Sequence, residues 1–306
     1  MPTMELNTWI LGQGGVLAAL LLGFAAGVLL CRWVCSRKAK NTGKEQNCMG
    51  VQEISRSKTA GVQYAVHQDI GRRQDQQDSY GISDLSGYEE NGVLALVADG
   101  MGGLQNGKAV SSALVYSFLN YFRMHADKEA PQMLLLEMAA QANEYINQML
   151  QGCEPGGSTL ISAIVRNGEL FFLTVGDSRI YLYRQGLLLQ LNREHTVREM
   201  LAVSAANHEV PIDWGMLDPQ RDALTSYFGG GRLLHIDRNP EGIRLKKGDR
   251  VLLLSDGVFR TLACGELESA LQCSVEEAVM KIGQKIRQED DPYQDNSTAL
   301  ILEYLG

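Results

Sequence analysis

Hydrophobic and polar residues follow two distinct patterns along the chain. Apolar residues that recur every three or four positions predict amphipathic helices over residues 108–122, 131–150 and 274–287. Short apolar runs bounded by glycine and polar residues predict β-strands. We expect these strands over residues 63–67, 92–98, 159–165, 170–175, 180–183, 187–191, 250–254 and 298–303.

The order of these elements indicates the fold class. Residues 166–191, "RNGELFFLTVGDSRIYLYRQGLLLQL", hold three strands separated by short polar turns, which is typical of an antiparallel meander. Long helices stand between groups of such strands, and the regular strand and helix alternation of a parallel sheet is missing from the pattern. The sequence therefore predicts an α+β fold in which antiparallel sheets are layered with helices.

The first 35 residues carry a different pattern. No charged residue occurs from Leu6 to Cys31, and about 20 apolar residues are enough to span a bilayer. The preceding "MPTMEL" has no Lys or Arg, and no small-residue cleavage pattern stands out, which disfavours a secretory signal peptide. We therefore predict a single-pass anchor over residues 1–35 in the cell membrane. The positive-inside rule places the rest of the chain in the cytoplasm, because basic residues follow the run at Arg32, Arg37, Lys38, Lys40 and Lys44.

The remainder divides into a linker and one domain. Residues 36–58 are polar and lack periodicity, and we interpret them as a juxtamembrane linker. Residues 59–306 show no repeat, no low-complexity segment and no second linker, so we predict a single domain there. The net charge of the chain is −8, and the basic residues are concentrated near the anchor, so the domain itself is more acidic still. Such a domain is a poor nucleic-acid binder and a plausible site for cations.

Several catalytic chemistries lack their residue patterns here. The six cysteines form no CxxC pair and the five histidines form no HExxH, which disfavours a zinc enzyme. A G-x-S-x-G elbow is missing, as is a cysteine with an arginine six positions on, which disfavours the matching hydrolases. Residues 102–109, "GGLQNGKA", approach a phosphate-binding P-loop, but Ala109 stands where that loop needs a hydroxyl for Mg²⁺. Nucleotide binding is therefore only a third hypothesis.

Four aspartates occur at or near the end of an apolar run, beside glycine or a small polar residue. Any one of them alone would be interpreted as a turn or helix-cap aspartate. Asp99 and Asp256 each end a strongly apolar strand and precede glycine, which places both carboxylates at the same kind of sheet edge. Converging carboxylates repel one another unless cations neutralise them. The four residues are Asp78, Asp99, Asp256 and Asp295.

Oxygen ligands of this kind favour Mg²⁺ or Mn²⁺. Two such ions about 3.5–4 Å apart can share a water, lower its pKa and hold a phosphoryl oxygen for in-line attack. Arg72 or Arg73 is placed to grip the phosphate. The hydrolysis of phosphate monoesters is among the slowest uncatalysed reactions. A two-metal centre is one of the few catalytic arrangements that can accelerate it enough.

Six segments, in this order, resemble the metal-dependent serine/threonine protein phosphatases of type 2C (PPM), particularly the bacterial members. The likeness runs over nearly all of residues 59–306, and the ordered set of motifs is far more specific than any one of them. The segments are "GRRQDQQDS", "VADGMGG", "GGSTL", "TVGDSRIYLY", "LLLSDGV" and "QDNSTALIL".

The resemblance implies a central sandwich of two antiparallel β-sheets flanked by α-helices on both faces. It implies that two Mg²⁺ or Mn²⁺ ions are held by the four aspartates and the main-chain carbonyl of Gly100, with Asp99 bridging the ions. Arg73, five residues before Asp78, would bind the substrate phosphate. Asp177, together with Asp256, would lie around a third, weaker metal ion. Residues 193–230 would include a mobile flap that influences substrate choice.

Three positions depart from the family pattern. Gln76 stands where Asn is usual. Met101 replaces a His that is the proposed general acid in many eukaryotic relatives, so the proton donor to the leaving group stays unassigned. Arg260, four residues past Asp256, stands where some relatives have another acidic ligand of the third metal ion, which argues against a firmly bound third ion.

The sequence thus predicts a membrane-anchored, cytoplasm-facing phosphatase. Its substrates would be phosphoserine and phosphothreonine proteins, and a serine/threonine kinase or its substrates would be its partners. A hydroxide that bridges the two metal ions would attack phosphorus directly. The alternative is a catalytically silent phosphatase-like module that binds or regulates at the membrane.

Overall fold

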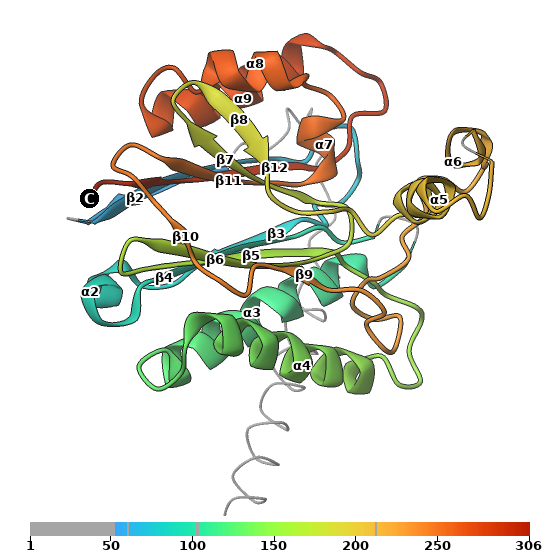
Figure 1. Cartoon of the computed structure of the whole chain (residues 1–306), viewed down its shortest axis with the longest axis horizontal. Helices are drawn as coiled ribbons and strands as arrows, with labels where there is room; N and C mark the ends of the chain where they lie inside the picture. The colour runs from blue at the N-terminus through green and yellow to red at the C-terminus, as the bar shows by residue number, and fades with distance from the viewer. Residues whose placement is uncertain (1–52, 60, 102–103, 212) are drawn as a thin grey trace, which may run out of the picture. The chain divides into compact units, whose positions relative to one another are not determined.

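The computed structural model describes residues 53–306, except 60, 102–103 and 212 (Figure 1). The predicted anchor over 1–35 and most of the predicted linker lie outside these residues. Among the helices of the described part, none has the length and apolar character needed to cross a bilayer.

Two antiparallel sheets form the centre of the domain (Figure 1). In the first sheet the strand order is β1 (Glu53–Lys58), β2 (Val62–Asp69), β12 (Ser297–Tyr304), β11 (Arg250–Leu254), β7 (Arg179–Arg184) and β8 (Leu187–Gln190). In the second sheet the order is β10 (Ile243–Arg244), β6 (Glu169–Val175), β5 (Leu160–Arg166), β4 (Val93–Ala98) and β3 (Ser79–Ile82), and β9 (Asp237–Arg238) also pairs with β6.

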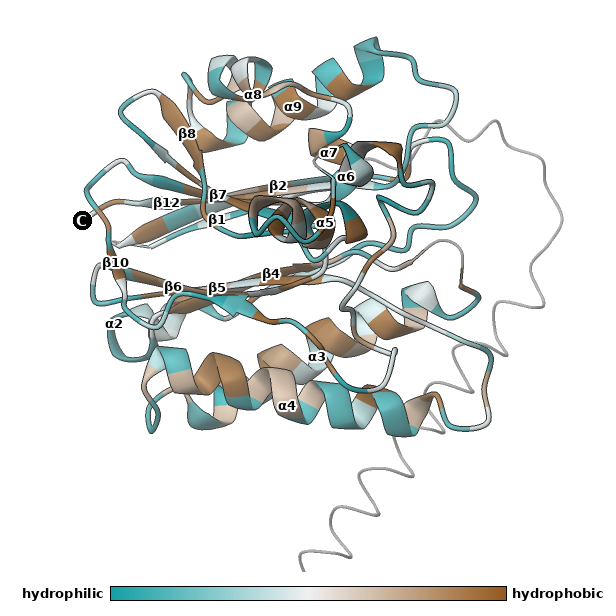
Figure 2. Cartoon of the chain, turned by 45° about the vertical axis from the view of Figure 1, so that its right-hand side comes forward, coloured by the Kyte–Doolittle hydropathy of each residue, from teal (hydrophilic) through white to brown (hydrophobic). Residues whose placement is uncertain are grey.

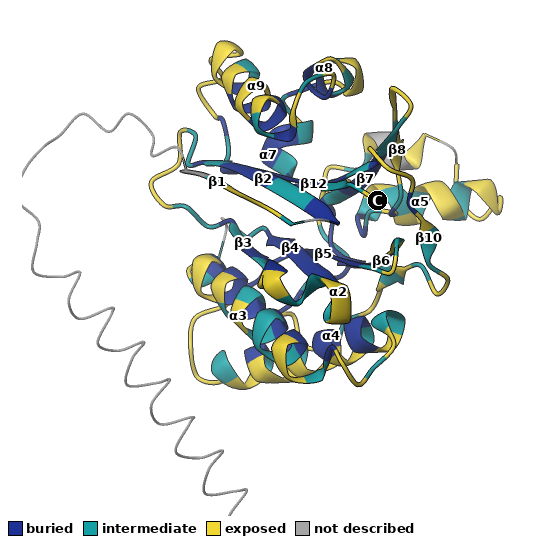
Figure 3. Ribbon diagram, turned by 90° about the vertical axis from the view of Figure 1, so that its left-hand side faces the viewer, coloured by how far each residue is buried: buried dark blue, intermediate teal, exposed yellow. Residues whose placement is uncertain are grey.

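Helices cover the outer face of each sheet. The first sheet is covered by α8 (Cys264–Ala270) and α9 (Val275–Gln288), and the second by α3 (Gly107–His125) and α4 (Pro131–Met149) (Figure 1). The inner sides of α3, α4 and α9 are buried and their outer sides are exposed (Figure 3). The observed order of layers is helix, sheet, sheet, helix, which confirms the predicted α+β sandwich.

Shorter helices occur in the connections. The 3-10 helix η1 (Leu85–Gly87) and helix α2 (Tyr88–Asn91) precede β4. Helix α7 (Asp256–Phe259) directly follows β11. Helices α5 (Val197–Ala206) and α6 (Trp214–Leu217) project from the end of the sandwich where α7 lies (Figure 1).

Strand β4 illustrates why the central strands are almost continuously apolar. Its sequence VLALVA is buried throughout. Leu94, Leu96 and Ala98 pack into the core beneath α3 and α4, whereas the alternate residues pack between the two sheets. A strand buried on both faces needs apolar residues at every position, because successive side chains point to opposite faces. Apolar residues accordingly concentrate on the strands and polar residues on the loops (Figure 2).

The predicted strands and long helices are present with ends shifted by a few residues. Of the predicted meander, the antiparallel pairing of β7 with β8 is confirmed, but the pairing of β6 with β7 is wrong. Strand β6 belongs to the second sheet and β7 to the first, so the chain crosses between the sheets after Val175. Gly176 makes this crossing with a φ of 104°, a conformation that glycine adopts readily. A β-carbon at Gly176 would lie 2.7 Å from side-chain atoms of Thr159.

The predicted C-terminal boundary of the linker, at residue 58, is also wrong. Residues 53–58 form β1, which pairs antiparallel with β2 from Glu53 opposite Gln68 to Lys58 opposite Gln63. The strand was missed because "EISRSK" holds only one apolar residue, so it shows no alternation of apolar and polar positions. Pairing with the edge of β2, which the sequence pattern does not reveal, forms this strand.

His67 on β2 provides a test of this packing. The ring is buried beneath α9, where a β-carbon on Gly283 would lie 2.3 Å from it. Burial lowers the pKa of His67 to about 4, Asp69 acts in the opposite direction, and Arg287 adds to the lowering. The unfolded chain therefore binds the proton more readily than the folded chain, and stability falls as pH drops from about 6.5 towards 4.

We predict that His67 alone makes folding about 2 kcal/mol less favourable on going from about pH 7 to about pH 5. The measurement is denaturant unfolding of the wild type and His67→Gln at both pH values. The difference between the two proteins isolates His67, because the other titrating groups are shared. Equal pH dependence in both proteins would contradict a neutral, buried His67.

Candidate active site

Strand register brings the predicted site residues to one end of the sandwich. In the second sheet Ser79 pairs with Ala98, so Asp78 and Asp99 are adjacent where β3 begins and β4 ends. In the first sheet Leu254 pairs with Ala299 and with Arg179. That register places the end of β11, the start of β12 and the start of β7 together. The residues that follow or precede these ends are Asp256, Asp295 and Asp177.

Asp78 connects the two sheets. Its carboxylate oxygen Oδ2 accepts hydrogen bonds from the Ser255 hydroxyl at 2.8 Å and from the Thr298 hydroxyl at 2.7 Å. Ser255 and Thr298 belong to the first sheet and its α7 connection, whereas Asp78 leads into the second sheet. Burial raises the pKa of Asp78 to about 7 although these two hydrogen bonds lower it.

Asp99 lies immediately after β4, and its main chain is held on both sides. The Asp99 amide donates to the Thr159 hydroxyl at 3.3 Å, and its carbonyl accepts from the Ser158 hydroxyl at 2.8 Å. Burial raises the pKa of the Asp99 carboxyl well above its usual range, and repulsion from Asp78 and Asp256 raises it further. A divalent cation beside these carboxylates would relieve this repulsion.

Gly100 permits a close approach of three main-chain segments. Its amide donates to the carbonyl of Gln77 at 3.2 Å, and its backbone also pairs with Ser158. A β-carbon at Gly100 would lie 2.6 Å from the Gln77 carbonyl and 2.7 Å from the main chain of Gly107. The glycine-rich turn therefore brings Asp99 close to the loop that carries Asp78.

Arg73 faces the site, and Arg72 does not. The Arg73 guanidinium lies 2.7 Å from Oδ2 of Asp295, and both side chains are partly exposed. The Arg72 guanidinium instead pairs at 2.6 Å with Asp290, on the exposed surface. The structure thus separates two arginines that the sequence alone left as alternatives.

Asp177 and Asp256 share one arginine. Arg260 contacts Oδ2 of Asp177 at 3.1 Å and Oδ2 of Asp256 at 3.2 Å. Burial raises the pKa of Asp177 to about 6, repulsion from Asp256 raises it further, and Arg260 acts in the opposite direction. Burial likewise raises the pKa of Asp256 against the effect of Arg260.

The donor set fits hard divalent cations. It consists of carboxylate and main-chain carbonyl oxygens, which suit Mg²⁺ or Mn²⁺. As the side chains stand, no group of three or more Asp, Glu, His or Cys residues in the described part of the chain encloses a metal position. Asp256 and Asp295 each also contact an arginine through Oδ2, at 3.2 Å from Arg260 and 2.7 Å from Arg73 respectively.

Three supporting residues were missed by reasoning from the sequence. Ser255 and Thr298 hold Asp78, and their only signal in the sequence was a hydroxyl residue within each of the two closing motifs. His195 was the third: its Nδ1 accepts from the amide of Gly176 at 3.1 Å, and its own amide donates to the Gly176 carbonyl at 2.8 Å. His195 therefore fixes the crossing that carries Asp177.

The segment predicted as a flap projects beside this site. It contains α5 and α6, and its two ends are joined by pairing of Thr196 with Leu224. A groove of about 520 Å³ lies between α5 and the return of the chain. It is lined by apolar and ring side chains that include Met200, Val203, Leu234 and His235.

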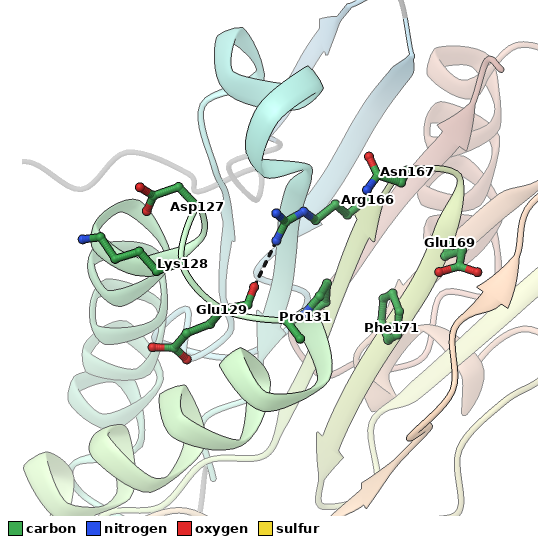
Figure 4. Close-up of a pocket in the computed structure, with 9 residues that line it drawn as sticks. Asp127, Lys128, Glu129, Pro131, Arg166, Asn167, Glu169 and Phe171 are labelled. Carbon is green, nitrogen blue, oxygen red and sulfur yellow. Dashed lines mark hydrogen bonds between the residues drawn. The ribbon is translucent and has the colours of Figure 1, made fainter.

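Another hollow, of about 350 Å³, lies beside the connection between α3 and α4 (Figure 4). Nη1 of Arg166 enters it and donates to the carbonyls of Ala126 at 2.9 Å and Glu129 at 3.0 Å. Both acceptors are main-chain atoms of the connection. Arg166 is therefore used to hold this loop against β5, and the aspartates of the candidate site do not line the hollow.

Comparison with known proteins agrees with this geometry. The family model described as protein phosphatase 2C matches residues 67–289. The serine/threonine phosphatase Stp of Listeria welshimeri is 27% identical over 67% of this chain and 81% of its own length. PppA, described as a regulatory component of the type VI secretion system in Pseudomonas aeruginosa, is 27% identical, with a TM-score of 0.65 over 80% of this chain and 98% of its own.

A more distant structure shares the fold. The catalytic domain of the phosphatase PstP, solved in complex with two manganese ions, is 22% identical to this chain and has a TM-score of 0.63. The match covers 80% of this chain and 99% of the PstP domain.

The contact between α7 and Asn296, the residue before β12, generates a prediction. A β-carbon at Gly257 would lie 2.0 Å from the carbonyl of Asn296. Gly257→Ala should therefore lower the free energy of unfolding by about 2 kcal/mol, because the main chain cannot move aside without disturbing both aspartate loops.

Gly265→Ala in α8 is the matched control. Nothing lies within 4 Å of its added β-carbon, and Ala in a helix is favoured over Gly by about 0.5–1 kcal/mol. Urea unfolding of both variants measures the contrast. Similar stability of the two variants would show that the Gly257 contact is not tight.

Proposed function

This chain belongs to the protein phosphatase 2C family, and we propose that it is a metal-dependent protein phosphatase acting on phosphoserine and phosphothreonine. The observation that carries the proposal is the convergence of aspartates from both sheets, joined through the hydrogen bonds of Asp78 to Ser255 and Thr298. Relatives with similar sequences are named serine/threonine phosphatases, and this supports the reaction.

The proposed metal ligands are the four converging aspartates and one main-chain carbonyl. Two Mg²⁺ or Mn²⁺ ions bound there would lower the pKa of an attacking water and polarise the phosphoryl group. The manganese in the PstP structure supports the choice of ion. The ligands we propose are Asp78, Asp99, the carbonyl of Gly100, Asp256 and Asp295.

The chain's own residues give these ligands their positions. Ser255 and Thr298 fix the orientation of Asp78 by donating to the same oxygen. Arg73 is the proposed phosphate-binding residue, because its side chain is about half exposed (48%) and its guanidinium already faces a carboxylate of the site. A planar guanidinium can hold two phosphate oxygens at once.

The proposed partners are phosphoproteins of serine/threonine kinase signalling, with the kinase or its substrates as the source of the phosphate groups. We also propose that residues 1–35 anchor the chain in the cell membrane, with the catalytic domain in the cytoplasm. The support is the uncharged run from Leu6 to Cys31 and the basic residues after it.

We predict that Asp99→Asn and Asp256→Asn each lower hydrolysis of a phosphothreonine peptide at least about 100-fold. In the absence of divalent metal ions, both variants should unfold at or above the wild-type temperature, because each substitution removes repulsion between carboxylates. The assay uses the full chain with and without Mn²⁺. Asp127→Asn, at an exposed aspartate beside the hollow in Figure 4, is the control with unchanged activity.

Full activity in excess chelator would overturn the metal-dependent mechanism. A catalytically silent module, the alternative function, would show no hydrolysis in the wild type under any metal condition. Calorimetric titration with Mn²⁺ separates the two, because a silent module has no need to bind two ions.

A second prediction concerns the anchor. Replacing Leu21 and Leu22 by Arg should release the chain from the membrane fraction, because each charge at the centre of a spanning helix costs roughly 2.5–3.5 kcal/mol. Replacement of both residues by Ile is the control that stays with the membrane. Cell fractionation followed by immunoblotting measures the outcome, and retention of the Arg variant would contradict the proposed anchor.

A further inference from the structure

Arg260 lies between one buried and one partly buried carboxylate of the candidate site, those of Asp177 and Asp256. It lies one helical turn after Asp256, and its Nε is 3.2 Å from Oδ2 of that residue. Its Nη2 is 3.1 Å from Oδ2 of Asp177, which belongs to the crossing between the sheets. The side chain of Asp177 is only 9% exposed, whereas that of Arg260 is 54% exposed. One guanidinium thus bridges two carboxylates from different loops.

We infer that Arg260 is a built-in counter-cation that holds Asp177 and Asp256 in place of an additional divalent ion. The inference rests on the proposed function, since it concerns the same group of aspartates. It adds that this position is filled by a side chain, so the chain binds no metal ion between Asp177 and Asp256.

Asp177 needs a positive charge and has few sources for one. Asp256 and Glu194 both lie close enough to repel its carboxylate. Arg179 is the other nearby arginine, but its Nε pairs with Glu194 at 2.6 Å and its guanidinium stacks 4.0 Å above the ring of Phe259. Among the ion pairs of the described residues, Asp177 is paired with Arg260.

The fold holds both partners of Arg260 in place. Gly176 and His195 fix the main chain next to Asp177 through two hydrogen bonds. On the other side, α7 is tied down by the fully buried Val258. The bridge therefore joins two rigid segments and does not depend on a mobile loop.

The chemistry of arginine suits this position. Its planar group presents several N–H donors in a fixed fork, so Nε and Nη2 can serve two carboxylates at once. Its charge is permanent at physiological pH. A lysine would place a point charge there and would contact both oxygens less well.

The test is the number of Mn²⁺ ions bound per full-length chain, measured by equilibrium dialysis. The wild type should bind two ions. Arg260→Ala should bind one more, with weaker affinity, because Asp177 and Asp256 then face each other without a cation. Arg260→Lys should bind two, because the positive charge remains. Arg123→Ala, which removes an exposed arginine on α3, should also bind two.

A double variant shows where the additional ion binds. When Asp177→Asn is combined with Arg260→Ala, the number of Mn²⁺ ions bound per chain should return to two. Arg260→Gln, which keeps most of the side-chain length, replaces Arg260→Ala if that protein fails to give the wild-type circular dichroism spectrum, and it should also bind three.

The inference is overturned if Arg260→Ala and Arg260→Gln bind the same number of ions as the wild type, or if the wild type already binds three. Failure of the proposed function gives a different result, in which the wild type binds no Mn²⁺ and hydrolyses no phosphopeptide. The readout is metal stoichiometry, so it does not depend on the activity of the loaded enzyme.

Discussion

Carboxylates that are buried side by side repel one another, and this end of the sandwich gathers aspartates from both sheets. The structure offsets the repulsion in two ways. The hydroxyls of Ser255 and Thr298 donate hydrogen bonds to the carboxylate of Asp78. Arginines face Asp295 and the pair formed by Asp177 and Asp256. The remaining negative charge is what gives hard divalent cations a reason to bind here, and the surrounding fold serves to hold these groups together against their repulsion.

The strands that carry the site were predictable because burial on both faces imposes an unmistakable pattern. The run before Asp99 is apolar at every position, and so are the four residues between Arg250 and Ser255. An aspartate directly after such a run marks the edge of a sheet. Strand pairing was not predictable in the same way. The apolar pattern of β6 and β7 is equally compatible with a hairpin and with a crossing between two sheets, because neighbouring partners do not appear in the local sequence.

The supporting residues were harder to predict than the aspartates for a related reason. Ser255 and Thr298 are ordinary strand-end residues until the register places both hydroxyls on one oxygen of Asp78. The residue pattern by itself left Arg72 and Arg73 open, and the family resemblance chose Arg73; in the structure the Arg73 guanidinium is the one that meets a site carboxylate. Arg260 stood out in the sequence only as a departure from a family pattern. Its contact with Asp177 joins residues that are far apart in the chain.

The crossing at Gly176 places β6 and β7 in different sheets, so the predicted pairing of these two strands fails. The same crossing places Asp177 in the candidate site. If β6 and β7 were a hairpin of one sheet, Asp177 would lie in an exposed turn and would not meet Asp256. Because the chain changes sheets there, the turn lies between the sheets and is clamped by His195 at the base of the projecting segment. Arg260 is also attracted by Asp222 of that segment. Asp222 itself is paired with Arg198 and Arg221, so the ion pairs that hold Arg260 are those with Asp177 and Asp256.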